Sequence, residues 1–389
     1  MVNAACLTRL KLTDFRNYRQ LDLDLDRRHV VLTGENGAGK TNLMEAVSLL
    51  TPGRGLRRAA YPDMCREGAG AGFTVFAALD GMQGPVEIGT SAGGDPENGG
   101  SGRRLRINGT NARSNDELLE HLRIVWLTPA MDGLFTGPAS DRRRFLDRQV
   151  LAIDPGHGKR VLDYERAMRS RNRLLSEGRL DPSWLSGIEV QMAEFGIAIA
   201  LARRELIAML TGLIDDRQDD GPFPRAGLQL EDFLSGIPGE NAAEQEEALA
   251  VQLAASRDRD AAAGRTLTGP HRSDLMVRHR GKDMDAARCS TGEQKALLVG
   301  LVLAHARLTG EICGHAPVLL LDEIAAHLDE GRRAALFDLV DALGGQAFMT
   351  GTDSAMFKAL GSRAEFLAVD SGTVARATAD AQEMPVKSQ

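Results

Sequence analysis

The chain is poor in several residue types on which whole classes of protein depend. Aromatic residues make up only 4% of its 389 positions, which disfavours binding of nucleic acid by stacking of bases on exposed rings. Acidic residues outnumber basic ones, 54 to 47, so any attraction to a polyanion must come from local patches. The four cysteines have the spacing of neither a zinc site nor a disulfide framework; they are Cys6, Cys65, Cys289 and Cys313.

Long apolar runs are lacking as well. The N-terminal segment has no continuous apolar stretch of the kind found in a signal peptide. The longest apolar runs, around Phe195–Ala202 and Ala296–Ala304, are predicted to be too short to span a bilayer. The composition, 43% hydrophobic and 26% charged, is ordinary for a globular protein, and the length suits two or three domains. We therefore expect a soluble, cytoplasmic protein with reduced thiols and no membrane partner.

One glycine-rich stretch carries the strongest chemical signal. The sequence GENGAGKT at positions 34–41 follows the apolar run Val30–Leu32 and precedes a segment with helical spacing of apolar residues. A strand, a glycine loop and a helix in this order predict a phosphate loop rather than a chance glycine turn, because the loop N–H groups and the helix dipole both attract anions. The expected nucleotide contacts are Gly34, Glu35, Asn36, Gly37, Ala38, Gly39, Lys40, Thr41 and Asn42. Lys40 would reach the β- and γ-phosphates, and Thr41 would bind Mg²⁺.

A second acidic motif lies far along the chain. The run Val318–Leu321 is wholly apolar, as in a central parallel strand, and it ends at Asp322 and Glu323. Asp322 is expected to hold Mg²⁺ through water, and Glu323 to polarise an attacking water, so Lys40 and Glu323 are the predicted catalytic residues. A buried strand that merely reaches solvent at its first charges is the alternative. Asp322 follows Thr41 by 281 positions, which predicts one nucleotide-binding core assembled from both ends of the chain.

Between these motifs, STGEQK at 290–295 precedes a helical run. Ser290 and Glu293 are spaced to form a capping box, and the helix start offers an anion-binding nest. A well-capped helix without further function is the alternative. The order of phosphate loop, S-x-G-x-Q, acidic strand and then Ala325–Asp329 resembles the ABC-type ATPases. That resemblance implies that Ser290, Gly292 and Gln294 contact the nucleotide bound to a second subunit.

The remaining pattern indicates a strand-rich part followed by a helical one. Strict alternation over Leu21–Asp26 predicts an antiparallel edge strand. Further strands are predicted near 7–15 and at 73–79, 86–88, 105–107 and 124–127, with a flexible hairpin connection over 89–102 and a turn at Asn108-Gly109. Apolar residues at helical spacing, among them Ile188, Met192, Phe195 and Ile199, predict one helix of an antiparallel pair whose partner covers about 159–177.

Five segments together resemble the RecF family of ABC- and SMC-type ATPases. They read LTDFRNY at 12–18, GENGAGKTN at 34–42, RRRFLD at 142–147, TGPHRSDL at 268–275 and STGEQKAL at 290–297. The third and fourth discriminate most, because ABC transporters lack both. The resemblance implies an α/β fold: an ABC-type P-loop ATPase head with a mixed sheet and an antiparallel subdomain, plus a helical lobe II with a short antiparallel helical arm. It places the head at 1–130 and 265–375 and the helical lobe at 131–264, and we expect a disordered tail at 376–389.

The same resemblance implies an ATP-dependent homodimer that clamps duplex DNA near single-strand gaps and works with RecO and RecR to load recombinase in DNA replication, repair and the SOS response. Slow ATP hydrolysis would release the clamp. The candidate DNA contacts are Arg54, Arg57, Arg58 and Arg104, for which a solvated basic face is the alternative reading. The scarcity of aromatic residues favours contact with the duplex backbone over readout of sequence.

Two other functions fit the sequence less well. An ATP-binding subunit of an ABC transporter is disfavoured, because 110–140 has no evident Q-loop glutamine and FMTGTD at 348–353 has no switch histidine. Thr352 and Asp353 are the residues nearest to that histidine's place. A small-molecule P-loop kinase is disfavoured by the long separation of the two nucleotide motifs and by the signature helix.

Overall fold

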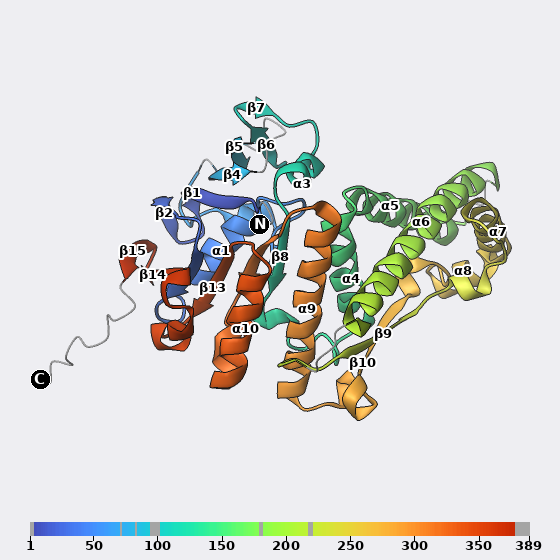
Figure 1. Cartoon of the computed structure of the whole chain (residues 1–389). Helices are drawn as coiled ribbons and strands as arrows, with labels where there is room; N and C mark the ends of the chain where they lie inside the picture. Colours follow the sequence, from blue (N-terminus) through green and yellow to red (C-terminus); the bar gives the residue numbers. More distant parts are fainter. Residues whose placement is uncertain are drawn as a thin grey trace, which may run out of the picture. The chain divides into compact units, whose positions relative to one another are not determined.

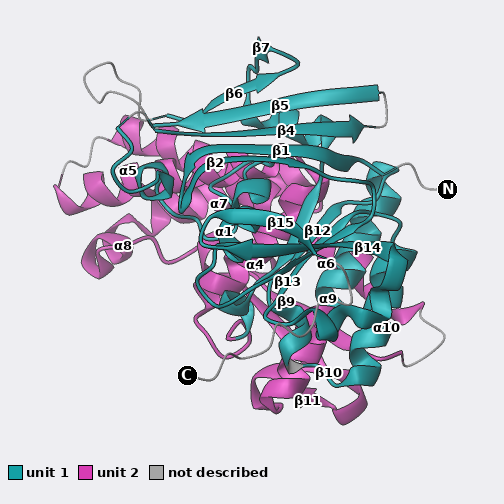
Figure 2. Ribbon diagram, turned by 90° about the vertical axis from the view of Figure 1, so that its left-hand side faces the viewer, with its two compact units in different colours: residues 1–132, 301–389 teal, residues 133–300 magenta. Residues whose placement is uncertain are grey.

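The computed structural model describes residues 4–70, 72–81, 84–93, 102–178, 182–216 and 221–377. They form two compact units, residues 1–132 with 301–389 (unit 1) and residues 133–300 (unit 2). Figure 1 labels the helices and strands, and Figure 2 colours the two units. The expected return to the head at residue 265 differs from this division, which falls after residue 300. The reason is that β9 (Ala226–Glu231) pairs with β10 (Asp274–His279) along its whole length. Of the expected disordered tail, 376 and 377 end a strand and 378–389 lie outside the described residues.

Unit 1 contains a largely parallel sheet in the order β15-β14-β3-β13-β12-β8. Its strands are β3 (His29–Thr33), β8 (Ile124–Leu127), β12 (Val318–Leu321), β13 (Ala347–Gly351), β14 (Ala364–Asp370) and β15 (Thr373–Ala377). Only β15 pairs antiparallel. The predicted central parallel strand is confirmed, because β12 is buried at every residue and pairs in parallel with β13 and β8. Strands β3 and β12, far apart in sequence, flank β13 on either side.

The second sheet of unit 1 is antiparallel, in the order β2-β1-β4-β5-β6-β7. Its strands are β1 (Cys6–Phe15), β2 (Tyr18–Asp24), β4 (Phe73–Gly81), β5 (Gly84–Ala92), β6 (Arg104–Ile107) and β7 (Thr110–Asn111). The alternating segment forms the edge strand β2, as predicted, and Asn108-Gly109 makes the β6–β7 turn with positive φ at both residues. The flexible segment predicted from residue 89 is wrong at its start, because Gly89–Ala92 pair with β4. Residues 94–101 of that segment lie outside the described residues.

Side chains of both sheets and of α1 form one hydrophobic core in unit 1. Leu43, Ala46 and Val47 of α1 are fully buried in it. The helices of this unit are α1 (Lys40–Ser48), α2 (Tyr61–Met64), α3 (Leu118–His121) and α10 (Glu330–Ala342), with 3₁₀ helices η2 (Asn115–Glu117), η3 (Pro129–Met131), η8 (Ile324–His327) and η9 (Ser354–Arg363). The core fixes the loop between β3 and α1 at both of its ends.

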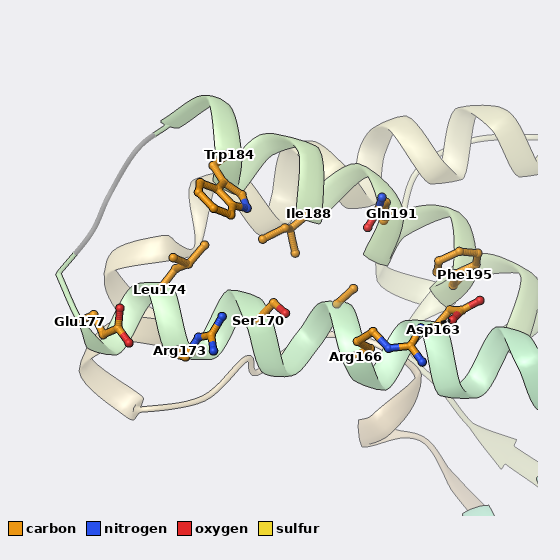
Figure 3. Close-up of a pocket in the computed structure, with 11 residues that line it drawn as sticks. Asp163, Arg166, Ser170, Arg173, Leu174, Glu177, Trp184, Ile188, Gln191 and Phe195 are labelled. Carbon is orange, nitrogen blue, oxygen red and sulfur yellow. Dashed lines mark hydrogen bonds and ion pairs between the residues drawn. The ribbon is translucent and has the colours of Figure 1, made fainter. Parts of the chain in front are cut away.

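Unit 2 is mainly helical. It contains α4 (Ala139–Ile153), α5 (His157–Ser176), α6 (Pro182–Asp215), α7 (Ala242–Ala255), α8 (Arg257–Ala263), the 3₁₀ helices η4 (Leu234–Gly236), η5 (Pro270–Arg272), η6 (Arg280–Lys282) and η7 (Ala286–Arg288), and the sheet β11-β10-β9 with β11 at Met284–Asp285. The predicted helical stripe is confirmed: Ile188, Met192 and Ile199 of α6 are buried in a core shared with α5 and α7. Helices α5 and α6 lie side by side and antiparallel, as predicted (Figure 3).

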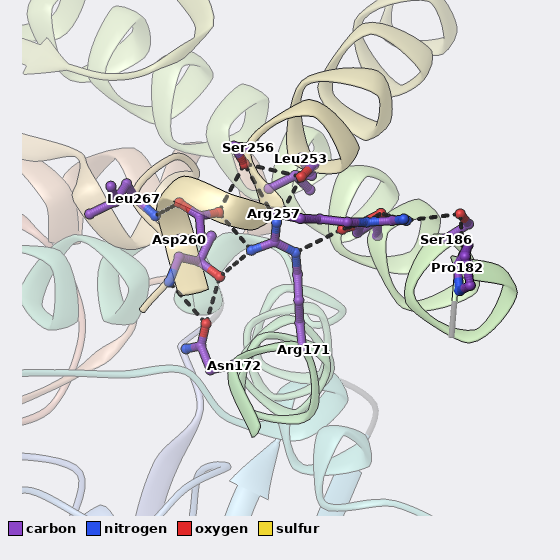
Figure 4. Close-up of polar contacts among 11 residues, drawn as sticks. Arg171, Asn172, Pro182, Ser186, Leu253, Ser256, Arg257, Asp260 and Leu267 are labelled. Atoms are coloured by element: carbon purple, nitrogen blue, oxygen red, sulfur yellow. Dashed lines mark hydrogen bonds and ion pairs between the residues drawn. The ribbon is translucent and has the colours of Figure 1, made fainter. Parts of the chain in front are cut away.

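A buried ionic cluster ties the helices of unit 2 together (Figure 4). The Arg171 side chain of α5 has no exposed surface and donates to Glu189 of α6 at 3.0 Å and to Asp260 of α8 at 2.7 Å. Its remaining N–H groups donate to the Thr266 hydroxyl at 2.9 Å and to the Leu253 carbonyl at 2.7 Å. Every charge in this cluster therefore has a hydrogen-bonded partner, which a buried charge requires.

Helix α9 (Thr291–Cys313) is long. It contains the apolar run Ala296–Ala304, which by itself is too short to cross a bilayer. The whole helix of 23 residues, however, is long and apolar enough to cross one, by length and composition only. Within the described residues it is the one helix of such length and composition, and 61% of its most apolar 18-residue stretch is buried inside the protein. Such burial is common in core helices of water-soluble proteins, so the length of α9 is weak evidence for a membrane span.

Candidate nucleotide-binding site

The glycine loop joins β3 to α1, as the sequence predicts. Gly34, Gly37 and Gly39 have φ of 147°, 86° and 117°, a region that side chains with a Cβ rarely adopt. A Cβ on Gly34 would overlap the Val369 carbonyl oxygen, and one on Gly39 would lie 2.5 Å from Asn17 Nδ2. The loop therefore needs glycine at both positions. Its tip, Glu35 to Gly37, is exposed, and Ala38 is buried where the loop meets α1.

Lys40 begins α1 and folds back across the loop. Its Nζ donates to the carbonyl oxygens of Gly34 at 2.7 Å and Glu35 at 2.8 Å, and the residue is 5% exposed. Burial lowers the pKa of Lys40, while the carboxylates of Glu323 and Asp322 oppose that shift. A cation held by two backbone carbonyl groups, beside the first N–H groups of a helix, matches what a bound phosphate chain requires.

The structure brings the acidic motif to the loop. Thr41 Oγ1 lies 3.1 and 3.2 Å from the two Asp322 carboxylate oxygens, although the residues are 281 positions apart. Asp322 directly follows β12, whose neighbour β13 separates it from β3. The two predicted halves of the site therefore meet at the carboxyl edge of one parallel sheet, where open α/β sheets bind ligands.

The donor set fits Mg²⁺ as a cation bound together with phosphate. A hydroxyl and one carboxylate are few ligands by themselves, and in the described residues no group of three or more His, Cys, Asp or Glu side chains could hold a metal ion. Mg²⁺ usually keeps water and phosphate oxygens in its shell beside one or two carboxylates. Thr41 and Asp322 supply that type of partial shell, so the predicted metal residues lie together.

Glu323 has an unusual backbone. Its φ is 52° and its ψ is 28°, a left-handed conformation that few residues other than glycine adopt. Its N–H donates to Thr350 Oγ1 at 2.8 Å, and Thr350 Oγ1 donates to Asp322 Oδ1 at 2.7 Å. Strained backbone of this kind is concentrated at functional sites. Thr350 was not predicted as a site residue; the only signal is a hydroxyl in the otherwise apolar end of a strand.

A layer of asparagines supports the loop from behind, and its role was also not predicted. Asn17 Nδ2 donates to the Ala38 carbonyl at 3.1 Å, and Asn42 Nδ2 donates to Asn17 Oδ1 at 2.8 Å. The Tyr18 hydroxyl donates to the Gly39 carbonyl at 3.0 Å, and burial raises the pKa of Tyr18. Asn42, predicted as a nucleotide contact, thus reaches the loop through Asn17, a residue of the LTDFRNY segment.

The candidate DNA-contacting arginines are all exposed, but they differ in what holds them. Arg57 donates to Asn42 Oδ1 at 2.6 Å and to the fully buried Glu45 at 3.1 Å. The Arg54 guanidinium lies 5.9 Å from the centre of the Tyr61 ring. Arg58 has a left-handed backbone with φ of 57°, and Arg104 opens strand β6. Arg57 is therefore tied to the phosphate-loop helix.

Arg103, the neighbour of Arg104 in the chain, has a structural role. Its side chain donates to Thr90 Oγ1 at 2.8 Å, to the Thr51 carbonyl at 3.0 Å and to the Leu49 carbonyl. Burial lowers its pKa to about 10, and Tyr61 opposes that shift. These bonds hold the segment that follows α1, so this arginine is not available to a phosphate backbone.

The signature residues lie in unit 2, at the start of α9. Hydrogen bonds confirm the predicted capping box: the Ser290 N–H donates to Glu293 Oε2 at 3.0 Å, and the Glu293 N–H donates to Ser290 Oγ at 3.4 Å. Lys282 and Ser290 hold the pKa of Glu293 at about 2. Gln294 is buried, and its Nε2 donates to the Cys289 carbonyl at 2.9 Å, whereas Ser290 and Gly292 are exposed. Gln294 therefore shapes the turn, whereas Ser290 and Gly292 are open to solvent.

The segments RRRFLD and TGPHRSDL contact each other within unit 2. Arg142 forms a two-point ion pair with Asp274, at 2.7 Å for each oxygen, and Arg143 donates to the Ser273 carbonyl at 2.8 Å. Asp147 pairs in the same two-point way with Arg203 of α6, which also donates to the Pro270 carbonyl. The two segments thus form one polar cluster, and Arg142 is structural.

His271 extends that cluster. Its Nε2 lies 2.9 Å from the Thr266 carbonyl, and its Nδ1 lies 2.7 Å from the Tyr164 hydroxyl. A carbonyl only accepts, so Nε2 carries the proton and Nδ1 accepts from Tyr164. Burial lowers the pKa of His271 and raises that of Tyr164. The histidine is therefore held neutral inside unit 2.

The residues nearest to the missing switch histidine differ in role. Asp353 caps η9 by accepting from the Ala355 N–H at 2.8 Å, and Thr352 is exposed. This capping bond explains an aspartate at position 353 without any contact to a nucleotide. The Thr350 contact with Asp322 described above is the one that reaches the nucleotide site.

A hollow lies within unit 2, between α5 and α6 (Figure 3). It has a volume of about 810 Å³ and shares no residue with the nucleotide site. Leu174, Ile188 and Phe195 line its apolar part, and Arg166 and Arg173 project from α5. No glycine lies among its lining residues, so this hollow does not offer the backbone loop of a phosphate site.

Comparison with known proteins gives a consistent result. Residues 6–374 match the family model described as RecF/RecN/SMC N terminal domain. The DNA replication and repair protein RecF of Rhizobium meliloti (strain 1021) is 68% identical over 374 residues, covering 96% of this chain and 100% of that protein. The protein of the same name from Agrobacterium fabrum (strain C58 / ATCC 33970) is 64% identical, covering 96% of this chain and 99% of that protein.

Solved structures agree in fold. The recombination mediator protein RecF, solved as RecF-ATPrS in the RecFOR pathway, aligns with a TM-score of 0.82 at 23% identity, covering 97% of this chain and 99% of that chain. The Smc head domain with an extended coiled coil from Pyrococcus furiosus aligns with a TM-score of 0.52 at 16% identity, covering 96% of each. The predicted ABC-type ATPase head with a helical lobe is therefore confirmed as the fold.

Proposed function

The chain belongs to the RecF family, and we propose that it is an ATP-gated DNA clamp that acts in DNA replication and recombinational repair. One observation carries the proposal: a phosphate loop, the Thr41 hydroxyl and two consecutive carboxylate residues converge at one edge of the unit 1 sheet. The curated relatives are named DNA replication and repair protein RecF, and RecF has been solved as RecF-ATP in the RecFOR pathway. Both names support an ATP-dependent role in DNA repair for this chain.

Each residue of the site has a role in this proposal. The loop N–H groups and Lys40 bind the β- and γ-phosphates, and Lys40 exchanges its two carbonyl contacts for phosphate oxygens. Thr41 and Asp322 hold Mg²⁺, which neutralises phosphate charge when it is bound. Glu323 orients and polarises the attacking water. Hydrolysis by such a site is expected to be slow and to serve as a switch.

The exposed signature residues complete the site from a second copy of the chain. Ser290 and Gly292 lie at the start of α9, where the helix N-terminus favours an anion. In an ATP-bound homodimer they contact the γ-phosphate held by the partner's loop, and hydrolysis lets the two copies part. Gln294 supports that contact by fixing the turn through the Cys289 carbonyl.

The proposed ligand of the dimer is duplex DNA near a single-strand gap. Arg54, Arg57, Arg58 and Arg104 supply positive charge on exposed positions of unit 1. As implied by the family, the clamp works with RecR and RecO in the cytoplasm, under DNA damage as well as during replication. Contact with the phosphate backbone requires no aromatic surface and gives little sequence preference.

Size-exclusion chromatography of a Glu323→Gln variant tests the gate. This variant should bind ATP, hydrolyse it poorly and elute as a dimer with ATP, with gapped duplex DNA co-eluting. Lys40→Met is the matched control and should stay monomeric, because it lacks the phosphate-binding cation. A Glu323→Gln chain that stays monomeric in ATP and ignores DNA would refute the clamp. ATP binding without a DNA effect would instead favour a transporter-type subunit.

The DNA contacts are tested by salt titration. Replacing Arg58 or Arg104 with alanine should weaken duplex binding equally for unrelated sequences and reduce the slope of log affinity against log salt by about one. Arg307→Ala is the control, because Arg307 is exposed but paired with Glu311 on α9. Salt-insensitive binding, or an equal loss in the control, would rule out these arginines as phosphate contacts.

A further inference from the structure

Strand β13 places one hydroxyl between the two halves of the nucleotide site. Thr350 is fully buried near the carboxyl end of β13, which lies between the phosphate-loop strand β3 and the acidic strand β12. Its hydroxyl donates to Asp322 Oδ1 at 2.7 Å and accepts from the Glu323 N–H at 2.8 Å. We propose that Thr350 is a positioning residue for ATP hydrolysis, which holds the metal-binding carboxylate and the water-polarising residue in their working orientation.

The two hydrogen bonds act on consecutive residues. Strands β12 and β13 are in register, Leu321 opposite Met349, so the peptide that follows β12 passes directly beside Thr350. The donated bond fixes one oxygen of Asp322, whose carboxylate also meets Thr41. The accepted bond engages the N–H of Glu323 while that residue has a left-handed backbone. Without the hydroxyl, the Glu323 N–H loses its acceptor and the strained turn loses its restraint.

Packing alone would not require threonine at this position. Ala347, Phe348 and Met349, which precede it in β13, are apolar and fully buried, and valine has nearly the same shape as threonine. Valine at 350 would keep the shape but remove both hydrogen bonds. The hydroxyl is therefore the functional part of the side chain. This inference rests on the proposed ATPase function, because a positioning role has meaning only where Glu323 acts on a water.

Steady-state hydrolysis provides the first test. Thr350→Val should lower kcat by about 10- to 100-fold, the effect expected when a reacting group is displaced by a fraction of an ångström to an ångström. Nucleotide affinity should stay within about twofold, because the phosphate loop is unchanged. Thr350→Ser should restore most of kcat, since it restores the hydroxyl. Thr309→Val is the control: Thr309 is equally buried, and its hydroxyl donates to the His305 carbonyl on α9.

Hydrogen exchange gives a readout that does not depend on activity. The Glu323 amide should exchange faster in Thr350→Val than in the native chain or Thr350→Ser, while peptides of β12 keep their protection. Unchanged exchange at Glu323, native kcat in Thr350→Val, or a serine variant as impaired as the valine one would overturn the proposal. If the native chain neither binds nor hydrolyses ATP, the proposed function fails, and the exchange experiment still decides whether Thr350 holds the Glu323 turn.

Discussion

Replacing Arg171 with methionine should destabilise unit 2 selectively. The substitution keeps the length of an apolar stem but removes a guanidinium that is buried against Glu189 and Asp260, each 1% exposed (Figure 4). Glu189 keeps Arg257, whose Nη2 lies 2.5 Å from it, and Asp260 keeps the Ser256 hydroxyl at 2.9 Å. Removing one partner of a buried pair costs about 3–5 kcal/mol. Because both carboxylates keep another partner, we expect a value near the lower end, about 3 kcal/mol.

Native-state hydrogen exchange measures this cost in the right place. Amides in the middle of α6 should lose about 3 kcal/mol of opening free energy, whereas amides of β3 and β13 in unit 1 should change little. Arg169→Met on the same helix is the control, because Arg169 is exposed and its ion pair with Glu165 is 3.7 Å long. This substitution should change stability by less than about 0.5 kcal/mol. A loss below about 1 kcal/mol for Arg171→Met would refute the structural role of the cluster.

Two further predictions concern acid stability and the glycine loop. Burial alone would raise the pKa of Asp147, but His157 and Arg203 outweigh it and lower the pKa to about 2. The stabilisation from this carboxylate is therefore complete above about pH 4 and is lost as the pH falls toward 2. The expected loss is roughly 2 kcal/mol in the opening free energy of unit 2. An Asp147→Asn chain should show no such loss from this site, and an identical dependence of stability on pH in both chains would contradict the role of Asp147. Gly39→Ala should weaken ATP binding more than Gly37→Ala, because a Cβ at 39 meets Asn17 whereas a Cβ at 37 meets open space. Equal losses of ATP affinity in a nucleotide titration would show that backbone strain alone matters.

The nucleotide half-sites could be predicted from the sequence because each is encoded locally. The glycine loop needs particular residues at fixed spacing, and the apolar run that ends at Asp322 marks a covered parallel strand. Their meeting across 281 positions followed from the order of motifs, and the contact between Thr41 and Asp322 confirms it. Helix α6 could be predicted for the same reason, since its apolar stripe repeats every three or four residues.

The residues that were missed act through contacts that no local pattern encodes. Thr350 looks like one polar residue in an apolar strand, and only the sheet order brings it beside Asp322. Asn17 reaches the loop through a contact 21 positions away. The division into units differs from the expected domain boundary for a related reason: β9 and β10 pair across more than forty residues, and residues 265–300 fall in unit 2.

In the proposed dimer each chain carries half of a γ-phosphate site, and a mixing experiment tests this arrangement. A Lys40→Met chain keeps its signature helix but lacks the phosphate-binding cation, and a Ser290→Arg chain keeps its loop but blocks its own signature. In a slowly hydrolysed ATP analogue each chain alone should elute as a monomer, whereas an equimolar mixture should form a dimer with one working site. A mixture that stays monomeric, or a Ser290→Arg chain that dimerises alone, would rule out a γ-phosphate site shared between two chains.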